Sequence, residues 1–177
     1  MFDKLNRFTP FALLMLATAC TKEAPVQPQP EPEEPGTVVV IENNVNKDLL
    51  LHMVNEVRAQ GCNCGSTVMP PVQPVSWNIL LELAAAKHSK DMVERKYFSH
   101  NSPDGTTPQT RITAAGYKYS WSGENIASGF SREADVISGW LKSEGHCKNL
   151  MSANYKEMGI GRANGVWTQV FAAPSGK

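Results

Sequence analysis

Apolar residues recur at helical spacing in two long segments of the chain. The first segment follows Asn46, a good helix cap, and ends at Gly61. The second is predicted to begin after Ser76 as its cap and to run to about Lys96, with small alanines that let another element pack closely. The residues between these segments are rich in glycine and proline, so we expect an irregular loop there.

Shorter elements are predicted in the second half of the chain. They are a helix opened by Thr107 and Pro108 and closed by Gly116, a buried strand over 124–129, a helix capped by Ser131 that ends near Ser143, and a helical stub over 145–151. Apolar segments flank Asn164-Gly165, which predicts a hairpin of strands 158–163 and 166–171. Helices followed by a C-terminal hairpin indicate an α+β fold with an antiparallel sheet.

The two ends of the chain differ in composition from its centre. Residues 1–19 carry early positive charge and a short apolar run, which predicts a signal peptide. Small residues before Cys20 resemble a bacterial lipoprotein signal, so Cys20 is the expected lipidation site. Residues 20–43 are rich in proline and glutamate and predict an extended linker. The folded domain is predicted over 44–174. We therefore expect an exported, membrane-anchored lipoprotein, periplasmic or at the cell surface.

The charge of the chain argues against one class of partner, nucleic acid. The chain has 177 residues and a formal net charge of +0, without a run of lysine and arginine. Binding to nucleic acid requires a clustered basic face. Nucleic acid is therefore not an expected partner, and we expect an envelope or extracellular ligand instead.

Three polar clusters at predicted element ends carry the candidate chemistry. They are Phe98-Ser99-His100, Ser122-Gly123-Glu124-Asn125 and Ser143-Glu144-Gly145-His146-Cys147. Such positions are where scaffolds place functional side chains. We expect His100, Glu124 and His146 to converge on one cleft. Away from these clusters, His88 lies on an apolar helix face, which indicates a hydrogen-bonded core residue, and His52 is expected to be exposed.

Four motifs then resemble one family. Phe98-Ser99-His100, Gly123-Glu124-Asn125-Ile126-Ala127, Trp140 through Gly145-His146, and Trp167-Thr168-Gln169-Val170-Phe171 have the order and spacing typical of the CAP superfamily, or SCP domains. The resemblance covers about residues 46–172 and is closest to the compact bacterial branch. It implies an α-β-α sandwich, with a three-stranded antiparallel sheet between helices and a cleft on one side.

The resemblance also implies a site. In many members the cleft holds two histidines and two acids, and the histidines can hold a divalent metal. Here His100 and His146 match the histidines and Glu124 matches one acid. The position of the second acid is Ser143, so the set is incomplete. Two neutral imidazoles and a carboxylate suit Zn²⁺, while the alternative is that Glu124 ties the two histidines together by hydrogen bonds.

The cysteines other than Cys20 are Cys62, Cys64 and Cys147. In an exported protein one disulfide can form and one thiol is left over. The resemblance to bacterial relatives implies Cys64–Cys147. A Cys62–Cys147 bond remains the alternative, a Cys62–Cys64 bond would be strained, and a Cys/His metal site is disfavoured by an oxidising compartment.

Three function hypotheses follow. The first is a lipid-anchored binding domain with a His/Glu cleft, with Zn²⁺ or another divalent cation as its candidate cofactor. The second is a metal-dependent hydrolase acting on peptide, lipid or cell-wall material, in which zinc lowers the pKa of water to about 7. The third is a structural domain without a cleft ligand. A serine nucleophile at Ser99 or Ser143 is a weaker option, because neither lies in a nucleophile elbow.

Overall fold

Two antiparallel strands form the centre of the sheet. The computed structural model describes residues 42–176, and within it β5 (Glu157–Ala163) pairs with β6 (Val166–Pro174). Their turn is Asn164-Gly165, with φ of 43° and 77°. Positive φ at both turn residues suits the twist of a hairpin, and the predicted hairpin is confirmed.

The sheet has four strands in the order β3-β5-β6-β4. Strand β4 (Tyr119–Ser128) pairs antiparallel with β6, so β5, β6 and β4 form the predicted antiparallel sheet. Strand β4 starts well before the predicted 124–129. The fourth strand, β3 (Ser76–Trp77), was not predicted; it adds two residues parallel to β5 at the edge. The α+β class is confirmed, with a sheet that is mixed rather than purely antiparallel.

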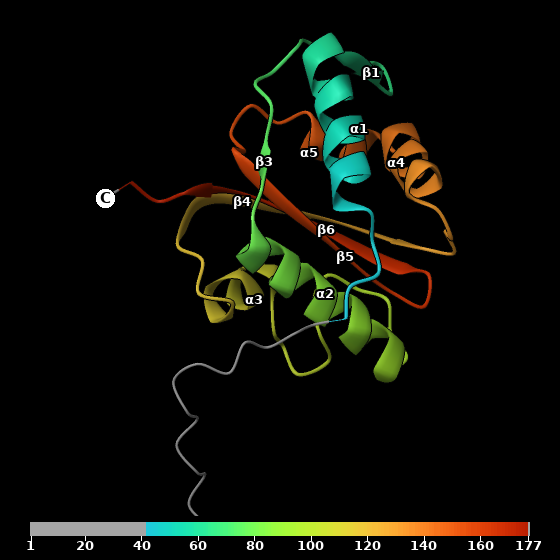
Figure 1. Cartoon of the computed structure of the whole chain (residues 1–177), viewed down its shortest axis with the longest axis vertical. Helices are drawn as coiled ribbons and strands as arrows, with labels where there is room; N and C mark the ends of the chain where they lie inside the picture. The colour runs from blue at the N-terminus through green and yellow to red at the C-terminus, as the bar shows by residue number, and fades with distance from the viewer. Residues whose placement is uncertain (1–41, 177) are drawn as a thin grey trace, which may run out of the picture. The chain divides into compact units, whose positions relative to one another are not determined.

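Helices cover both faces of this sheet (Figure 1). One core lies between the sheet and α1 (Lys47–Gln60), α4 (Glu133–Lys142) and α5 (Glu144–Leu150). The other core lies between the sheet and α2 (Ile79–Glu94) and α3 (Pro108–Ala114). Neighbouring residues of β6 alternate between the two cores, as Val170 and Phe171 do. The arrangement is an α-β-α sandwich.

Helix caps were predicted with mixed success. Asn46 caps α1 and Thr107 caps α3, each by accepting a backbone N–H in its side chain. Helix α2, however, is capped by Asn78, which accepts from Leu80 and Leu81, so the predicted cap at Ser76 is wrong. Ser131 is not the cap of α4 either: Arg132 precedes that helix and makes no side-chain cap bond. Serine and asparagine are both good caps, and tertiary pairing of β3 decided between Ser76 and Asn78.

The segment predicted as irregular loop contains a small hairpin. Strand β1 (Cys62–Cys64) pairs antiparallel with β2 (Thr67–Met69). A two-stranded hairpin is marginal in isolation. Here Cys64 is fully buried in the core that also contains residues of α1, and β1 contacts α5, so tertiary contacts hold β1 in a sequence whose composition favours a loop.

Arg58 is buried at the end of α1 and crosses to the opposite helix. Its guanidinium donates to the carbonyl oxygens of Gln73 at 2.9 Å, Leu150 at 2.7 Å and Ser152 at 3.0 Å. Burial lowers the pKa of Arg58 to about 10. Backbone carbonyls at the end of α5 thus satisfy a buried cation, which fixes the position of that helix end.

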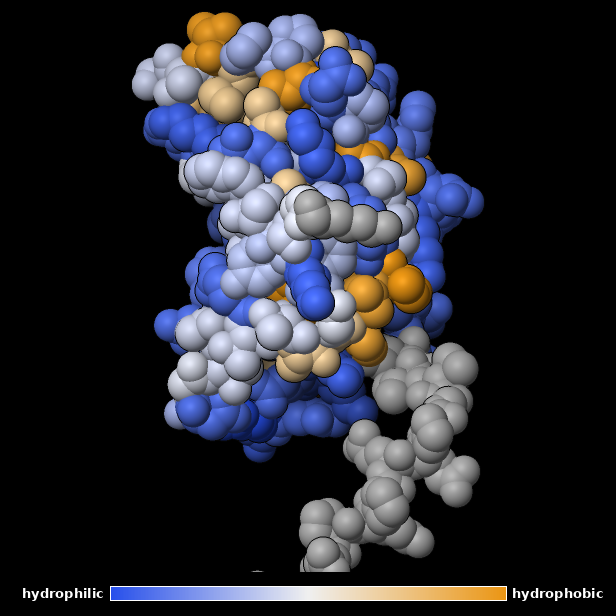
Figure 2. All heavy atoms as spheres, turned by 90° about the vertical axis from the view of Figure 1, so that its left-hand side faces the viewer, coloured by the Kyte–Doolittle hydropathy of each residue, from blue (hydrophilic) through white to orange (hydrophobic). Residues whose placement is uncertain are grey.

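The surface on one side of the molecule is largely polar. Figure 2 shows apolar side chains only in small groups separated by polar ones on that face. Small separate groups of this kind are ordinary features of protein surfaces. Among residues 42–176 no helix has the length and apolar character needed to cross a membrane. The predicted signal peptide, Cys20 and the linker up to residue 41 lie outside the described residues, and the domain boundaries 44–174 stay a prediction.

The helix α2 packs unusually close to β5. A Cβ atom at Gly161 would lie 2.2 Å from the backbone nitrogen of Ala86, and one at Gly159 would lie 2.1 Å from that of Glu82. The small alanines of α2 and the glycines of β5 together allow this approach, as the sequence predicts for the alanines. Relief of such a clash requires the helix backbone to move, since no flexible side-chain end is involved.

We expect Gly161→Ala to lower the free energy of unfolding by about 3 kcal/mol, the upper end of the overpacking range. Urea denaturation measures this change. Gly145→Ala is the matched control, because a Cβ there meets nothing within 4 Å and the residue lies in α5, where alanine is favoured. Equal stability of the two variants would contradict the close packing of α2 on β5.

Candidate functional site

A buried carboxylate on β4 is the centre of the site. The side chain of Glu124 is 3% exposed. Its Oε2 accepts from Arg111 of α3 at 2.8 Å, and its Oε1 accepts from Nδ1 of His100 at 2.8 Å. The same Arg111 nitrogen donates to the carbonyl oxygen of His100 at 2.8 Å. We call the three residues Glu124, Arg111 and His100 the Glu124 clamp. Because hydrogen bonds to ionised groups are the stronger ones, the clamp holds the loop after α2 against α3 and β4.

The clamp also sets the tautomer of His100. Because Nδ1 donates to Glu124, the neutral ring carries its proton on Nδ1 and leaves the lone pair of Nε2 available. The side chain is 48% exposed. His100 therefore offers an oriented, solvent-accessible nitrogen, in the way that a carboxylate orients a metal-binding imidazole.

His146 lies near the start of α5 and lines the same groove as His100. Asn125, which is 1% exposed on β4, positions it: its Nδ2 donates to the carbonyl oxygen of His146 at 3.3 Å, and its Oδ1 accepts from Asn149 at 2.9 Å. Burial lowers the pKa of His146, and the neighbouring His100 lowers it further. The imidazole of His146 is therefore neutral at pH 7.

One groove contains the two histidines and Glu124, with a volume of ≈ 650 Å³. Its lining residues come from the loop after α2, from β4, from α5 and from the segment after α5: His100, Ser122, Gly123, Glu124, Asn125, Gly145, His146, Lys148, Asn149, Ser152 and Tyr155. The lining is polar. Within it a Cβ at Gly123 would lie 2.2 Å from the Tyr155 hydroxyl and 2.4 Å from Oδ1 of Asn149, so only glycine lets these side chains reach β4.

The structure places His100, Glu124 and His146 in one groove, but the hydrogen-bond partners of Glu124 differ from those expected. Glu124 bonds His100 and Arg111, so the hypothesis that it ties both histidines together by hydrogen bonds holds for His100 alone. Ser143 ends α4 and precedes α5. It is absent from the groove lining described above, as is Ser99. The adjacent Glu144 pairs with Lys148 at 2.5 Å. Glu124 is thus the one carboxylate in the described lining.

His88 is a core histidine, as the sequence predicts. Its side chain is 0% exposed and its Nε2 donates to the carbonyl oxygen of Ser99 at 3.0 Å. The same nitrogen lies 3.9 Å from Oε1 of Glu124. Burial lowers the pKa of His88, which keeps the ring neutral beside the carboxylate.

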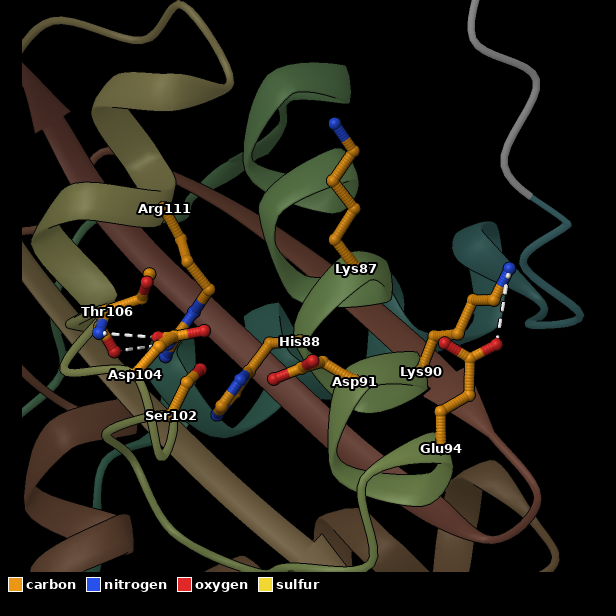
Figure 3. Close-up of a pocket in the computed structure, with 9 residues that line it drawn as sticks. All are labelled: Lys87, His88, Lys90, Asp91, Glu94, Ser102, Asp104, Thr106 and Arg111. Carbon is orange, nitrogen blue, oxygen red and sulfur yellow. Dashed lines mark hydrogen bonds and ion pairs between the residues drawn. The ribbon is translucent and has the colours of Figure 1, made fainter.

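His88 and Arg111 also line a second cavity (Figure 3). Figure 3 shows them reaching from α2 and α3 toward Asp91 and Ser102, whereas Lys90 pairs with Glu94 away from this group. Tyr97 donates to Asp91 and lies 3.4 Å from Nδ1 of His88. These contacts hold His88 in place beside the carboxylate of Glu124.

The sequence did not reveal several residues that build the site. Arg111 gave no sign of its role, because its partner Glu124 belongs to a different element and only the fold brings the two together. Asn149 and Tyr155 are linked at 2.8 Å and depend on the fold in the same way. Asn125 had one available signal: it follows Glu124 in the Gly-Glu-Asn motif, and a strand places adjacent side chains on opposite faces.

A disulfide lies directly behind His146. It joins Cys64 of β1 to Cys147 of α5, with a Cα–Cα distance of 5.4 Å, and among the cysteines that the structure describes Cys62 is the free thiol. This is the pair that the family resemblance implies, and the alternative Cys62–Cys147 bond is not formed. Closing a loop with a sequence separation of 83 is worth roughly 4–5 kcal/mol in the chain-entropy model.

Metal-binding donors gather most tightly at the cysteines. In the described part of the chain, the cluster of possible ligand atoms within 4.8 Å of one another is Cys62, Cys64 and Cys147, two of which share the disulfide. In the groove, both oxygens of Glu124 are engaged by Arg111 and His100. The imidazoles of His100 and His146 are therefore the remaining candidate ligands of the groove, and Glu124 orients the ring of His100.

Comparison with known proteins identifies relatives of this chain. Over 102 residues the chain is 34% identical to the uncharacterized protein YkwD of Bacillus subtilis (strain 168), which is 56% of this chain and 40% of that protein. It is also 34% identical over 97 residues to the uncharacterized membrane protein YlbC of the same organism, 55% of this chain and 28% of that protein. The chain thus spans less than half the length of either relative.

Two solved structures share the fold. One is an extracellular protein containing an SCP domain from Bacillus anthracis str. Ames, with a TM-score of 0.63, 30% identity, and coverage of 71% of this chain and 39% of that chain. The other is an outer surface protein from Borrelia burgdorferi, with a TM-score of 0.61, 20% identity, and coverage of 72% of this chain and 92% of that chain. The second likeness concerns the fold alone. A model of the cysteine-rich secretory protein family matches residues 51–171, so the chain belongs to that family, the CAP proteins.

Proposed function

We propose that this domain is an extracytoplasmic binding module whose polar ligand occupies the groove of His100, Glu124 and His146. The observation that carries the proposal is the orientation of His100 by a buried carboxylate in the same groove as His146. Amide and hydroxyl groups make up much of the remaining lining. They suit a ligand with hydrogen-bonding groups of its own.

The hydrogen bonds that Glu124 already makes favour a binding role over a hydrolytic one. Glu124 is already bonded to Arg111 and His100, so it is not free to take a proton from water. The second acid of the family pattern is replaced by Ser143, outside the described lining. A general base needs an available acceptor within hydrogen-bond reach of the proton that it removes. The groove is better suited to holding a ligand than to cleaving one.

A divalent cation such as Zn²⁺ would be held by Nε2 of His100 and by the imidazole of His146. Both rings are suitable as neutral ligands, and His146 is kept neutral by its lowered pKa. Bound zinc would act as a Lewis acid toward an oxygen of the ligand. Glu124 would stay behind His100 as the orienting group.

Zinc titration by calorimetry tests this proposal. With the disulfide intact, we expect one equivalent to bind the wild type and the His100→Ala/His146→Ala variant to lose more than about 100-fold in affinity, beyond the 10–100-fold typical of losing only an outer-shell partner. His52→Ala is the control, since His52 is exposed on α1. Equal, negligible zinc uptake by the wild type and the double variant would contradict the cation site.

The proposed location follows from the chain ends and from the relatives. The predicted signal peptide and Cys20 support export with a lipid anchor, and the proline-rich linker would hold the domain away from the membrane. The similar Bacillus anthracis protein is described as extracellular and the Borrelia burgdorferi protein as an outer surface protein. Several acyl chains would make such an anchor stable, at about 0.8 kcal/mol per buried methylene.

Labelling of growing bacteria with a tagged fatty acid tests the anchor. We expect the wild type to carry the label and Cys20→Ser to lose it, because Cys20 is the predicted acceptor. Cys62→Ser, which removes a cysteine from the folded domain, is expected to keep it. Label on Cys20→Ser equal to that on the wild type would refute a lipid at this residue.

A further inference from the structure

Three sulfur atoms meet where β1 packs on α5. Cys62 and Cys64 lie two residues apart on β1, so both side chains extend from the same side of the strand. Cys147 approaches from α5. The sulfur of Cys62 lies 3.6 Å from that of Cys147 and 3.9 Å from that of Cys64. A free thiol is therefore in contact with both atoms of the disulfide.

The three cysteines differ in their access to solvent. Cys64 and Cys147 are both 0% exposed, whereas Cys62 is partly exposed. A small thiol or disulfide in solution therefore reaches Cys62 before it reaches either sulfur of the bond. Exchange proceeds by attack of a thiolate on a sulfur through a mixed disulfide, and access to that sulfur helps to set its rate.

We propose that Cys62 is a thiol–disulfide exchange site through which small external disulfides and thiols form and open the buried Cys64–Cys147 bond. The proposal goes beyond the groove and does not depend on its ligand. Opening the bond would release α5 from β1 next to His146, so the exchange site would also control one wall of the groove.

Formation begins with three thiols and an external disulfide, RSSR. The Cys62 thiolate attacks one sulfur of RSSR, forming a mixed disulfide at Cys62 and releasing RS⁻. The Cys147 thiolate then attacks the Cys62 sulfur, forming Cys62–Cys147 and releasing the second RS⁻. Finally the Cys64 thiolate attacks the Cys147 sulfur and Cys62 leaves as a thiolate, which takes up a proton. Two protein thiols are oxidised to one disulfide and RSSR is reduced to two RSH.

The geometry also shows which movement each exchange step requires. Cys62 is nearly equidistant from the two bonded sulfurs, so it lies beside the bond rather than on its axis. Displacement at sulfur requires approach along that axis, and the side chain of Cys62 must rotate before each transfer. Burial raises the pKa of Cys62, so the thiolate that starts each exchange becomes more abundant, and the exchange faster, as the pH rises.

Closure of the bond in the whole protein tests the proposal. The protein is reduced, freed of reductant, exposed to oxidised glutathione and quenched at intervals, and Cys64–Cys147 is quantified by peptide mapping. We expect Cys62→Ser to close at least about tenfold more slowly than the wild type, because access to the buried sulfurs then limits the reaction. Asn63→Ser, at the exposed position between the two cysteines, is the control and should match the wild type. Closure of Cys62→Ser at the wild-type rate would overturn the proposal.

Early samples of the wild type provide a second readout that needs no variant. The first glutathione adduct is expected on Cys62, and it should decline as the Cys64–Cys147 bond appears. An adduct that forms first on Cys64 or Cys147 would show that external disulfides reach the buried sulfurs directly, and it would refute the exchange role of Cys62.

Discussion

The buried carboxylate of Glu124 is the interaction on which the site depends. It lies on the central sheet, almost without exposure, and is matched by the guanidinium of Arg111 and the imidazole of His100. Removing one partner of a buried ion pair leaves an uncompensated charge and costs about 3–5 kcal/mol. The clamp therefore stabilises the loop after α2 and sets the orientation of the exposed histidine at the same time.

The two walls of the groove are held by different means. The wall of β4 belongs to the sheet, while the wall of α5 is attached by the Asn125 amide, the carbonyl contacts of Arg58 and the disulfide at Cys147. Each attachment joins segments far apart in the sequence. The position of His146 relative to His100 thus depends on three long-range interactions, one of which is covalent and open to redox chemistry.

Local signals predicted the parts of the fold whose causes are local. The turn at Asn164-Gly165 requires positive φ, and Asn46 satisfies the first amides of α1, so both could be predicted from neighbouring residues. Ser76 failed as a cap because β3 pairs with β5 and delays the start of α2 to Asn78. The β1–β2 hairpin was missed for the same kind of reason: burial of Cys64 overrides a sequence that favours a loop.

The candidate site also contains some residues that local sequence signals reveal and others that only the fold reveals. His100, Glu124 and His146 stand out because polar residues at element ends form motifs, and the family resemblance orders them. Arg111 and Asn149 stand in ordinary helical segments, and only the fold brings them to Glu124 and Asn125. In a single sequence, the residues that would contact a ligand are easier to identify than the residues that position them.

The most direct test of the central claim is the tautomer of His100 in solution, read from the ¹⁵N NMR shifts of the imidazole rings at alkaline pH. The clamp predicts that Nδ1 of His100 is protonated and Nε2 is not, whereas the exposed His52 in the same spectrum shows the averaged shifts of a free imidazole. Averaged shifts for His100 as well, matching those of His52, would show that Glu124 does not hold the ring and would contradict the account.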